Sequence, residues 1–195
     1  MTVTAETIPA PTDMPEMSWS RSGAAYAWAE EAALRPDYRS PAQALVHAMV
    51  AEIMPRGRYG PTDYRDLAHT ILAAVARVPD PHPREIFRYC YGQGVHRGPH
   101  LASTIAEAVQ ARHSKTYSQV VRLAQVAVFR QRTRLQWRQA AGMGWYARAI
   151  GISRPALYKA GWEELIADAE TEVQTALERG RRLAREELVA AGVMR

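Results

Sequence analysis

The sequence predicts an all-α protein, a helical bundle with a long C-terminal helix, and three observations predict it. Apolar residues recur at spacings of three and four in stretches that prolines and glycines separate. No stretch alternates apolar and polar residues with a period of two between turn signals, so strands are not needed to explain any part of the chain. Finally, 47% of the 195 residues are apolar, which is enough to bury a core.

The first half of the chain is expected to contain a flexible tail, residues 1–17, and an N-terminal helical module, residues 18–107. The tail is rich in Pro, Thr and Glu and has little periodic apolar character. In the module, serine and threonine indicate where helices begin, because their side-chain oxygens can accept hydrogen bonds from the free N–H groups of a first turn. Prolines indicate where helices end. The expected helices are Ser18–Leu34, Ser40 through Ile53, Thr62 up to Pro79, and Arg84–Tyr91, with Pro81 and Pro83 interrupting the chain between the last two.

The second half begins with a glycine-rich stretch, Gly92–Pro99, which is expected to be a linker, and continues with helices at about 100–112 and about 116–140. The C-terminal region, residues 163–195, is expected to be one long helix up to Ala191. One face of this helix is apolar with spacings of three and four. This face can pack against the chain's own helices, or against a second copy in a homo-oligomer through residues 163–191. Its members are Ile166, Ala169, Val173, Ala176, Gly180 and Leu183.

Charge is distributed unevenly along the chain. The formal net charge is +5, but residues 108–162 contain 10 Lys and Arg and no Asp or Glu. The flanking regions, residues 1–107 and 163–195, are both mildly acidic. A block of this length without a carboxylate is typical of a protein that binds a polyanion. The functional site is therefore expected within residues 108–162.

Inside this block, residues 143–162 have the pattern of a helix-turn-helix, in which a second helix packs across a first through a tight turn. Ala147 is the small residue at the crossing, and Gly151 follows at the turn, where a left-handed backbone favours glycine. Ser153 is expected to cap the second helix, with Pro155 in its first turn. The inward positions fall on Tyr146, Ile150, Ile152, Leu157 and Ala160. The predicted fold is therefore a helical bundle that contains a helix-turn-helix.

A helical hairpin that serves only as core is the alternative, because Ala, Gly and Ile are common in any bundle. The charge favours DNA binding instead. The motif lies at the end of the acid-free block, and Arg148, Arg154 and Lys159 fall on its outward positions. We therefore expect double-stranded DNA as the partner, with the second helix in the major groove.

Base contacts are expected from the outward residues near the start of the second helix. Arg154 is the main candidate, because a guanidinium group can donate two hydrogen bonds to the O6 and N7 atoms of guanine. The full set expected to read bases is Arg154, Pro155, Tyr158 and Lys159.

Phosphate contacts are expected from Arg148 and Ser153 and from three arginines that recur every four residues and so share one helical face. These three are Arg130, Arg134 and Arg138. A solvated face is the commoner role of a run of charges. Such a face usually carries compensating glutamates, however, and none is expected to be available here.

The segment Trp137-Arg138-Gln-Ala-Ala-Gly142, followed by Trp145 and by Ala147-Arg148-Ala-Ile-Gly-Ile-Ser-Arg154, resembles a family of small bacteriophage and prophage helix-turn-helix proteins. The resemblance covers about residues 135–165. It implies a DNA-binding protein of phage ancestry, of the kind found among late-gene regulators and small terminase subunits, without choosing between them. The chain departs from the family at Lys159-Ala-Gly-Trp162, where a basic pair usually precedes the final tryptophan.

Three functions are compatible with these features of the sequence. The first is a sequence-specific transcription regulator whose residues 18–107 hold another protein, with RNA polymerase as the candidate. The second is a DNA-packaging subunit similar to a small terminase, which forms a ring through its C-terminal helix. The third is a protein-binding module with no role on nucleic acid, which predicts no salt-dependent retention on DNA.

Other chemistry has little support in the sequence. The histidines have neither cysteine partners nor His-Glu-x-x-His spacing, and no nucleophile elbow or phosphate-binding loop is present, so we expect no enzyme, no metal and no cofactor. The single cysteine, Cys90, is expected to be a small buried apolar residue. No apolar run approaches the roughly 20 residues that span a bilayer. With no secretory signal recognised at the start, the expected location is the cytoplasm of a bacterial host, at the nucleoid.

Overall fold

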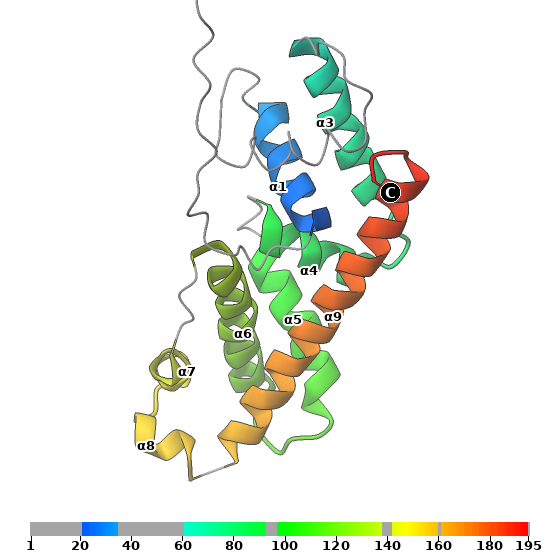
Figure 1. Cartoon of the computed structure of the whole chain (residues 1–195). Coiled ribbons are helices and arrows are strands. Elements are labelled where there is room, and N and C mark those ends of the chain that lie inside the picture. The colour runs from blue at the N-terminus through cyan, green and yellow to red at the C-terminus, as the bar shows by residue number, and fades with distance from the viewer. Residues whose placement is uncertain (1–20, 35–60, 93–96, 138–141, 160, 195) are drawn as a thin grey trace, which may run out of the picture.

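The structure of the chain, a computed structural model, describes residues 21–34, 61–92, 97–137, 142–159 and 161–194 (Figure 1). Within these ranges it contains eight α-helices and no strand, which confirms the all-α prediction. The helices are α1 (Arg21–Leu34), α3 (Pro61–Ala76), α4 (Pro81–Tyr91), α5 (Gly98–Gln110), α6 (Tyr117–Trp137), α7 (Met143–Ile150), α8 (Arg154–Leu157) and α9 (Trp162–Ala190). The predicted tail and the helix predicted from Ser40 lie outside the described residues.

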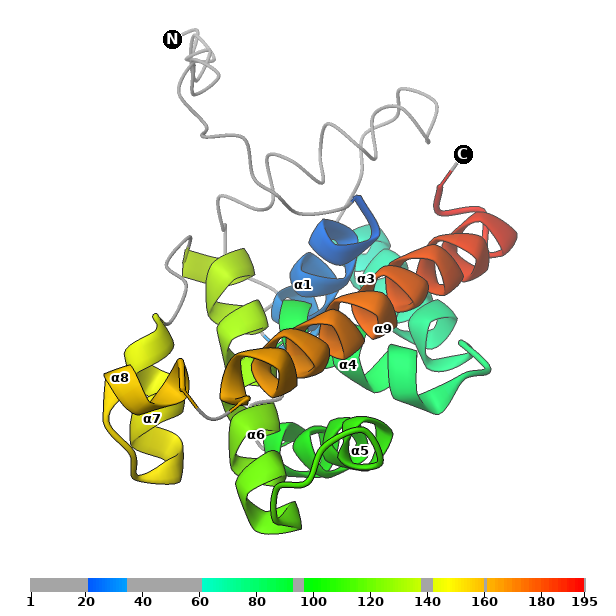
Figure 2. The ribbon, with the colours of Figure 1, turned by 90° about the horizontal axis from the view of Figure 1, so that it is seen from below.

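Helix α9 is the long C-terminal helix that the sequence predicts, and it organises the fold. It crosses the body of the protein and packs against α1, α3, α4, α5 and α6 (Figures 1 and 2). Its apolar face is used in these contacts, since Ile166 and Val173 are almost fully buried within the chain. Packing against the chain's own helices, one of the two possibilities for this face, is therefore observed.

The buried residues form two clusters along α9. The larger one joins α4, α5, α6 and α7, with residues of α1, α3 and α8, to α9 as far as Ala184, and it includes Phe87, Ile105 and Leu165. The smaller one joins α1 and α3 to the C-terminal end of α9 around Trp28 and Leu188. The larger cluster draws residues from all three helical regions expected from the sequence, so those regions share one core.

Helix α4 begins earlier than the sequence predicts, because its prolines belong to the helix. Pro81 and Pro83 lie in its first turn, after the N-cap residue Asp80, whereas they were expected to interrupt the chain before Arg84. A first turn tolerates proline, because its N–H groups have no partner inside the helix. The backbone N–H of Arg84 already donates to the Asp80 carbonyl at 3.2 Å.

Gly180 allows α4 and α9 to cross closely. A Cβ atom at this position would lie 2.4 Å from the carbonyl oxygen of Pro83 and 3.0 Å from Cβ of Phe87. Both distances are shorter than van der Waals contact, so the backbones approach at a separation that only glycine permits. The crossing fixes α9 against the body, and α9 in turn provides the surface on which α6 and α7 are held.

Candidate functional site

The α7–α8 unit, residues 143–159, lies at the edge of the molecule beside α6 in both views (Figures 1 and 2). The chain leaves α7 through Gly151, whose φ of 74° and ψ of 29° are left-handed. The N–H of Ile152 donates to the Ala147 carbonyl at 3.0 Å, which closes the end of α7. The sequence prediction of a turn at Gly151 is confirmed, and its conformation explains the glycine.

The inward side of the unit is also as predicted. Tyr146, Ala147, Ile150 and Leu157 are buried in the larger core cluster, and Ile152 is half-buried against it. The fifth predicted inward position, Ala160, lies outside the described residues. The unit is thus fixed to the body by apolar contacts on one side, and its other side is left exposed.

Helix α8 differs from the expectation in its length and in its cap. It is a single turn, Arg154–Leu157, so Tyr158 and Lys159 follow the helix instead of belonging to it. Ser153 occupies the N-cap position with an extended backbone, but its side chain makes no capping hydrogen bond. Pro155 lies in the first turn as predicted.

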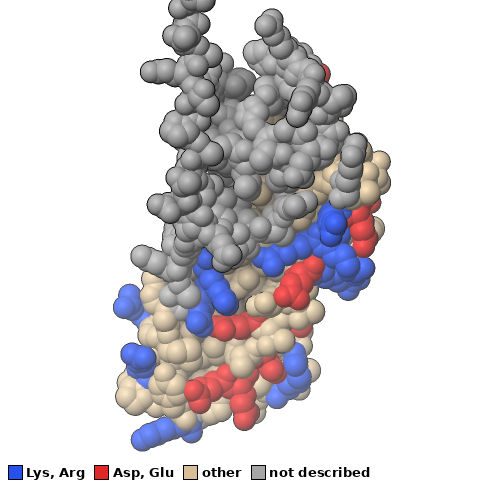
Figure 3. Space-filling view, viewed as in Figure 1, with Lys and Arg blue, Asp and Glu red and all other residues tan. Residues whose placement is uncertain are grey.

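The outward residues of the unit are exposed. Arg148, Ser153, Arg154, Pro155, Tyr158 and Lys159 all belong to this set. No carboxylate among the described residues lies within ion-pair distance of Arg148, Arg154 or Lys159. In Figure 3, Lys and Arg lie along the edge that α7 and α8 occupy, and Asp and Glu lie over α9, where further Lys and Arg are found as well. The unit therefore offers unpaired positive charge to solvent.

The arginines of α6 divide into three environments. Arg134 is exposed and has no ion pair within the described part of the chain. Arg132 lies on the opposite face, 9% exposed, with its guanidinium 5.0 Å from the ring centre of Tyr89. Arg130 forms an ion pair with Glu170 of α9. Arg138 lies outside the described residues.

The expectation that no carboxylate would be available to the basic block is therefore wrong for Arg130. It is also wrong at the N-terminal end of the block, where Asp168 of α9 lies 3.2 Å from Arg112 and 3.0 Å from Nε2 of His113. The physical reason is that α9, although acidic and distant in sequence, packs alongside α5 and α6. Counting charged residues along the sequence does not reveal these ion pairs.

Glu170 also connects α9 to the α7–α8 unit. The hydroxyl group of Tyr146 donates a hydrogen bond to Oε1 of Glu170 at 2.6 Å, and the same oxygen accepts from Arg130. Burial, together with this hydrogen bond, raises the pKa of Tyr146 well above its ordinary value, so its proton is retained. Sequence reasoning did not identify Glu170, and no local motif around it indicates the role.

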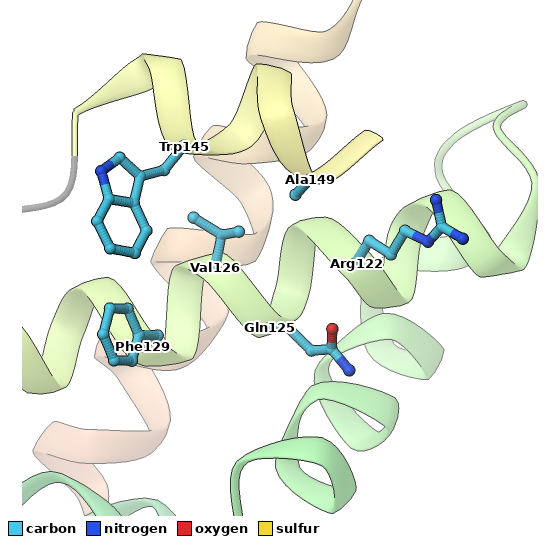
Figure 4. A pocket seen from close by; sticks show the side chains of 6 residues that line it. All are labelled: Arg122, Gln125, Val126, Phe129, Trp145 and Ala149. Carbon is cyan, nitrogen blue, oxygen red and sulfur yellow. The ribbon is translucent and has the colours of Figure 1, made fainter. Parts of the chain in front are cut away.

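An open groove of about 480 Å³ separates α6 from α7 (Figure 4). Trp145 and Phe129 stack across it with ring centres 5.4 Å apart and planes inclined by 20°. Trp145 is 48% exposed, which is unusual for so large an apolar side chain. The groove is lined by Arg122, Gln125, Val126, Phe129, Trp145 and Ala149. In the sequence, Trp145 is distinguished only as part of the segment that carries the resemblance.

Neither a metal cluster nor a membrane span is found in the described part of the chain. No group of three or more His, Cys, Asp or Glu side chains there is arranged to hold a metal ion. None of the helices there is both long enough and apolar enough to cross a bilayer. Compared with protein-family models, with curated proteins and with solved structures, the chain matches none of them.

Proposed function

We propose that the protein is a sequence-specific DNA-binding transcription regulator, of the phage type that its sequence resembles, and that the α7–α8 unit acts as a helix-turn-helix. One observation carries the proposal. Arg148, Arg154 and Lys159 are exposed without a carboxylate partner in the described chain, on a unit whose other side is buried. Phosphate groups of DNA are the partners that such unpaired cations attract.

The start of α8 is the part of the unit that enters the major groove. Arg154 is its first residue and Pro155 its second, and both are exposed. Arg154 reads guanine through two hydrogen bonds, which contributes about 1–3 kcal/mol of discrimination against other bases. Tyr158 and Lys159 follow the single turn and reach adjacent bases or phosphates from the end of α8.

Backbone contacts come from the flanks of the unit. Arg148 and Ser153 lie at the turn, and Arg134 lies on the exposed face of α6. These contacts are independent of base sequence, so they set affinity and register without setting specificity.

The packing of α9 supports the regulator over the packaging subunit. A ring built through the C-terminal helix would need the apolar face of that helix, but Ile166, Val173 and Leu177 are already buried within the chain. The N-terminal module, residues 18–107, binds the protein partner in this proposal, and RNA polymerase is the candidate partner.

The test is a binding selection on random double-stranded DNA, followed by titration of variants against the selected site and a scrambled site. Arg154→Ala should weaken binding to the selected site by about 1–3 kcal/mol and leave the scrambled site nearly unchanged. Arg134→Ala should weaken both sites by a similar factor and lower the salt dependence.

Arg182→Ala is the matched control, because Arg182 is an exposed arginine of α9 that pairs with Glu186 at 3.4 Å. It removes the same charge away from the proposed interface and should change neither site. If binding of the unsubstituted protein does not depend on salt, or if Arg154→Ala and Arg134→Ala behave alike on every sequence, the proposal fails. A large ring in light scattering would favour the packaging subunit instead.

A further inference from the structure

Glu170 stands where two elements of the proposed interface meet the body of the protein. Its Oε1 atom accepts a hydrogen bond from the hydroxyl group of Tyr146 on α7 and pairs with the guanidinium of Arg130 on α6. Glu170 is half-exposed, whereas Tyr146 has no exposed surface. One carboxylate therefore connects α6, α7 and α9 through charged hydrogen bonds.

Arg130 and Arg134, one helical turn apart on α6, differ in exposure and in this partner. Both arginines line a small cleft of about 40 Å³ between α6 and α9, together with Ala127, Gln131, Glu170 and Gln174. Arg134 is exposed and has no ion pair among the described residues, but Arg130 is turned toward Glu170. A guanidinium that donates to a carboxylate of its own chain is less able to donate to a DNA phosphate.

We propose that Glu170 is a positioning residue of the DNA interface. It withholds Arg130 from the DNA backbone, because the guanidinium group stays in an ion pair with the Glu170 carboxylate. It also holds the α7–α8 unit against α9 through the hydrogen bond from Tyr146. The proposal rests on the proposed function for its first part, whereas its second part concerns the protein alone.

Withholding Arg130 keeps the affinity for non-specific DNA low. Each phosphate contact strengthens binding to every sequence equally, so it raises non-specific affinity as much as specific affinity. In the cell, non-specific sites outnumber the specific one by many orders of magnitude, so an additional non-specific contact lengthens the search without improving the choice of site. The carboxylate also repels any phosphate that approaches the cleft.

The first test uses Glu170→Gln, which removes the charge but keeps an oxygen that accepts from Tyr146. Released from its ion pair, Arg130 should gain a phosphate. The plot of log affinity against log salt concentration should then steepen by about 0.9, the effect of one phosphate contact. Non-specific affinity should rise several-fold at about 50 mM salt, where electrostatic contacts are strongest.

Three comparisons decide this result. Arg130→Ala alone should leave the salt slope unchanged, and Glu170→Gln combined with Arg130→Ala should return it to the original value. Glu107→Gln removes the same charge from an exposed position on α5 and should not change the slope.

If Arg130→Ala lowers the slope as Arg134→Ala does, Arg130 already contacts phosphate and Glu170 does not withhold it. An unchanged slope for Glu170→Gln would also overturn the proposal.

The second test needs no DNA. Tyr146→Phe should speed amide hydrogen exchange in α7 and leave α5 unaffected. In a double-mutant cycle with Glu170→Ala, the destabilisations should be less than additive, because either change removes the same hydrogen bond. Additive effects would overturn the positioning role. If the unsubstituted protein shows no salt-dependent binding to DNA, the proposed function and the withholding role both fail, and the exchange experiment still decides the positioning role.

Discussion

Gly180→Ala tests whether the close crossing of α4 and α9 holds the fold together. In an exposed helix, replacing glycine by alanine gains about 1 kcal/mol of stability, because alanine loses less backbone entropy on folding. At Gly180 the new methyl group would lie 2.4 Å from the carbonyl oxygen of Pro83, which cannot move aside by rotation of a side chain. Overpacking of this kind costs up to about 3 kcal/mol, so we expect a net loss of about 2 kcal/mol.

Urea denaturation followed by circular dichroism measures this loss. A thermal scan should show a lower Tm, by about 2–4 °C for each kcal/mol in a chain of this size. Gly144→Ala is the matched control, because Gly144 lies in α7 and nothing would be within 4 Å of an added Cβ. It should be neutral or slightly stabilising. A Gly180→Ala protein as stable as the unsubstituted one would refute the argument that this crossing needs glycine.

Three further predictions follow from local features of the structure. Burial raises the pKa of the Cys90 thiol to about 12, so Cys90 should resist alkylation in the folded protein and react quickly in urea, as mass spectrometry can show. Burial lowers the pKa of His82 below 6.5, even though Glu172 and Asp80 act in the opposite direction. As the pH falls, the unfolded chain therefore protonates at His82 before the folded chain does. The contribution of neutral His82 to the free energy of unfolding is complete above pH 6.5 and is lost as the pH falls below that value. His82→Gln should reduce that loss in urea titrations between about pH 7 and pH 5. Finally, Gly151→Ala forces a side chain into a backbone with φ of 74° and should cost about 1 kcal/mol, with faster amide exchange in α7; unchanged exchange would refute the strain.

The helices could be predicted from the sequence because their signals are local. Apolar spacing gave α6 and α9 to within a few residues, and Gly151 marked its turn correctly, since left-handed backbone favours glycine wherever it occurs. The predicted start of α4 was wrong, because a proline can either stop a preceding helix or occupy a first turn, as Pro81 does, and the sequence signal is the same in both cases. The length of α8 was wrong as well, because a cap and a proline define where a helix begins but not where it ends.

The candidate site was only partly accessible to sequence reasoning. The outward positions of Arg148, Arg154 and Lys159 follow from helical periodicity, and the structure leaves all three exposed. The role of Arg130 does not follow from periodicity, because its partner Glu170 lies on a helix that is distant in the sequence and adjacent only in the fold. The exposure of Trp145 likewise depends on how α7 packs on α6.

The sequence by itself determined the helical class, the turn at Gly151 and the segment in which positive charge accumulates, since each depends on neighbours along the chain. The tertiary structure decided which of those charges remain available. Packing of the acidic helix α9 against α5 and α6 brings Asp168 and Glu170 to Arg112 and Arg130, and it leaves Arg134 and Arg154 without such partners among the described residues. It also decided that the apolar face of α9 is buried within the chain. Ion pairs and helix contacts depend on distance in space, which spacing along the sequence does not determine.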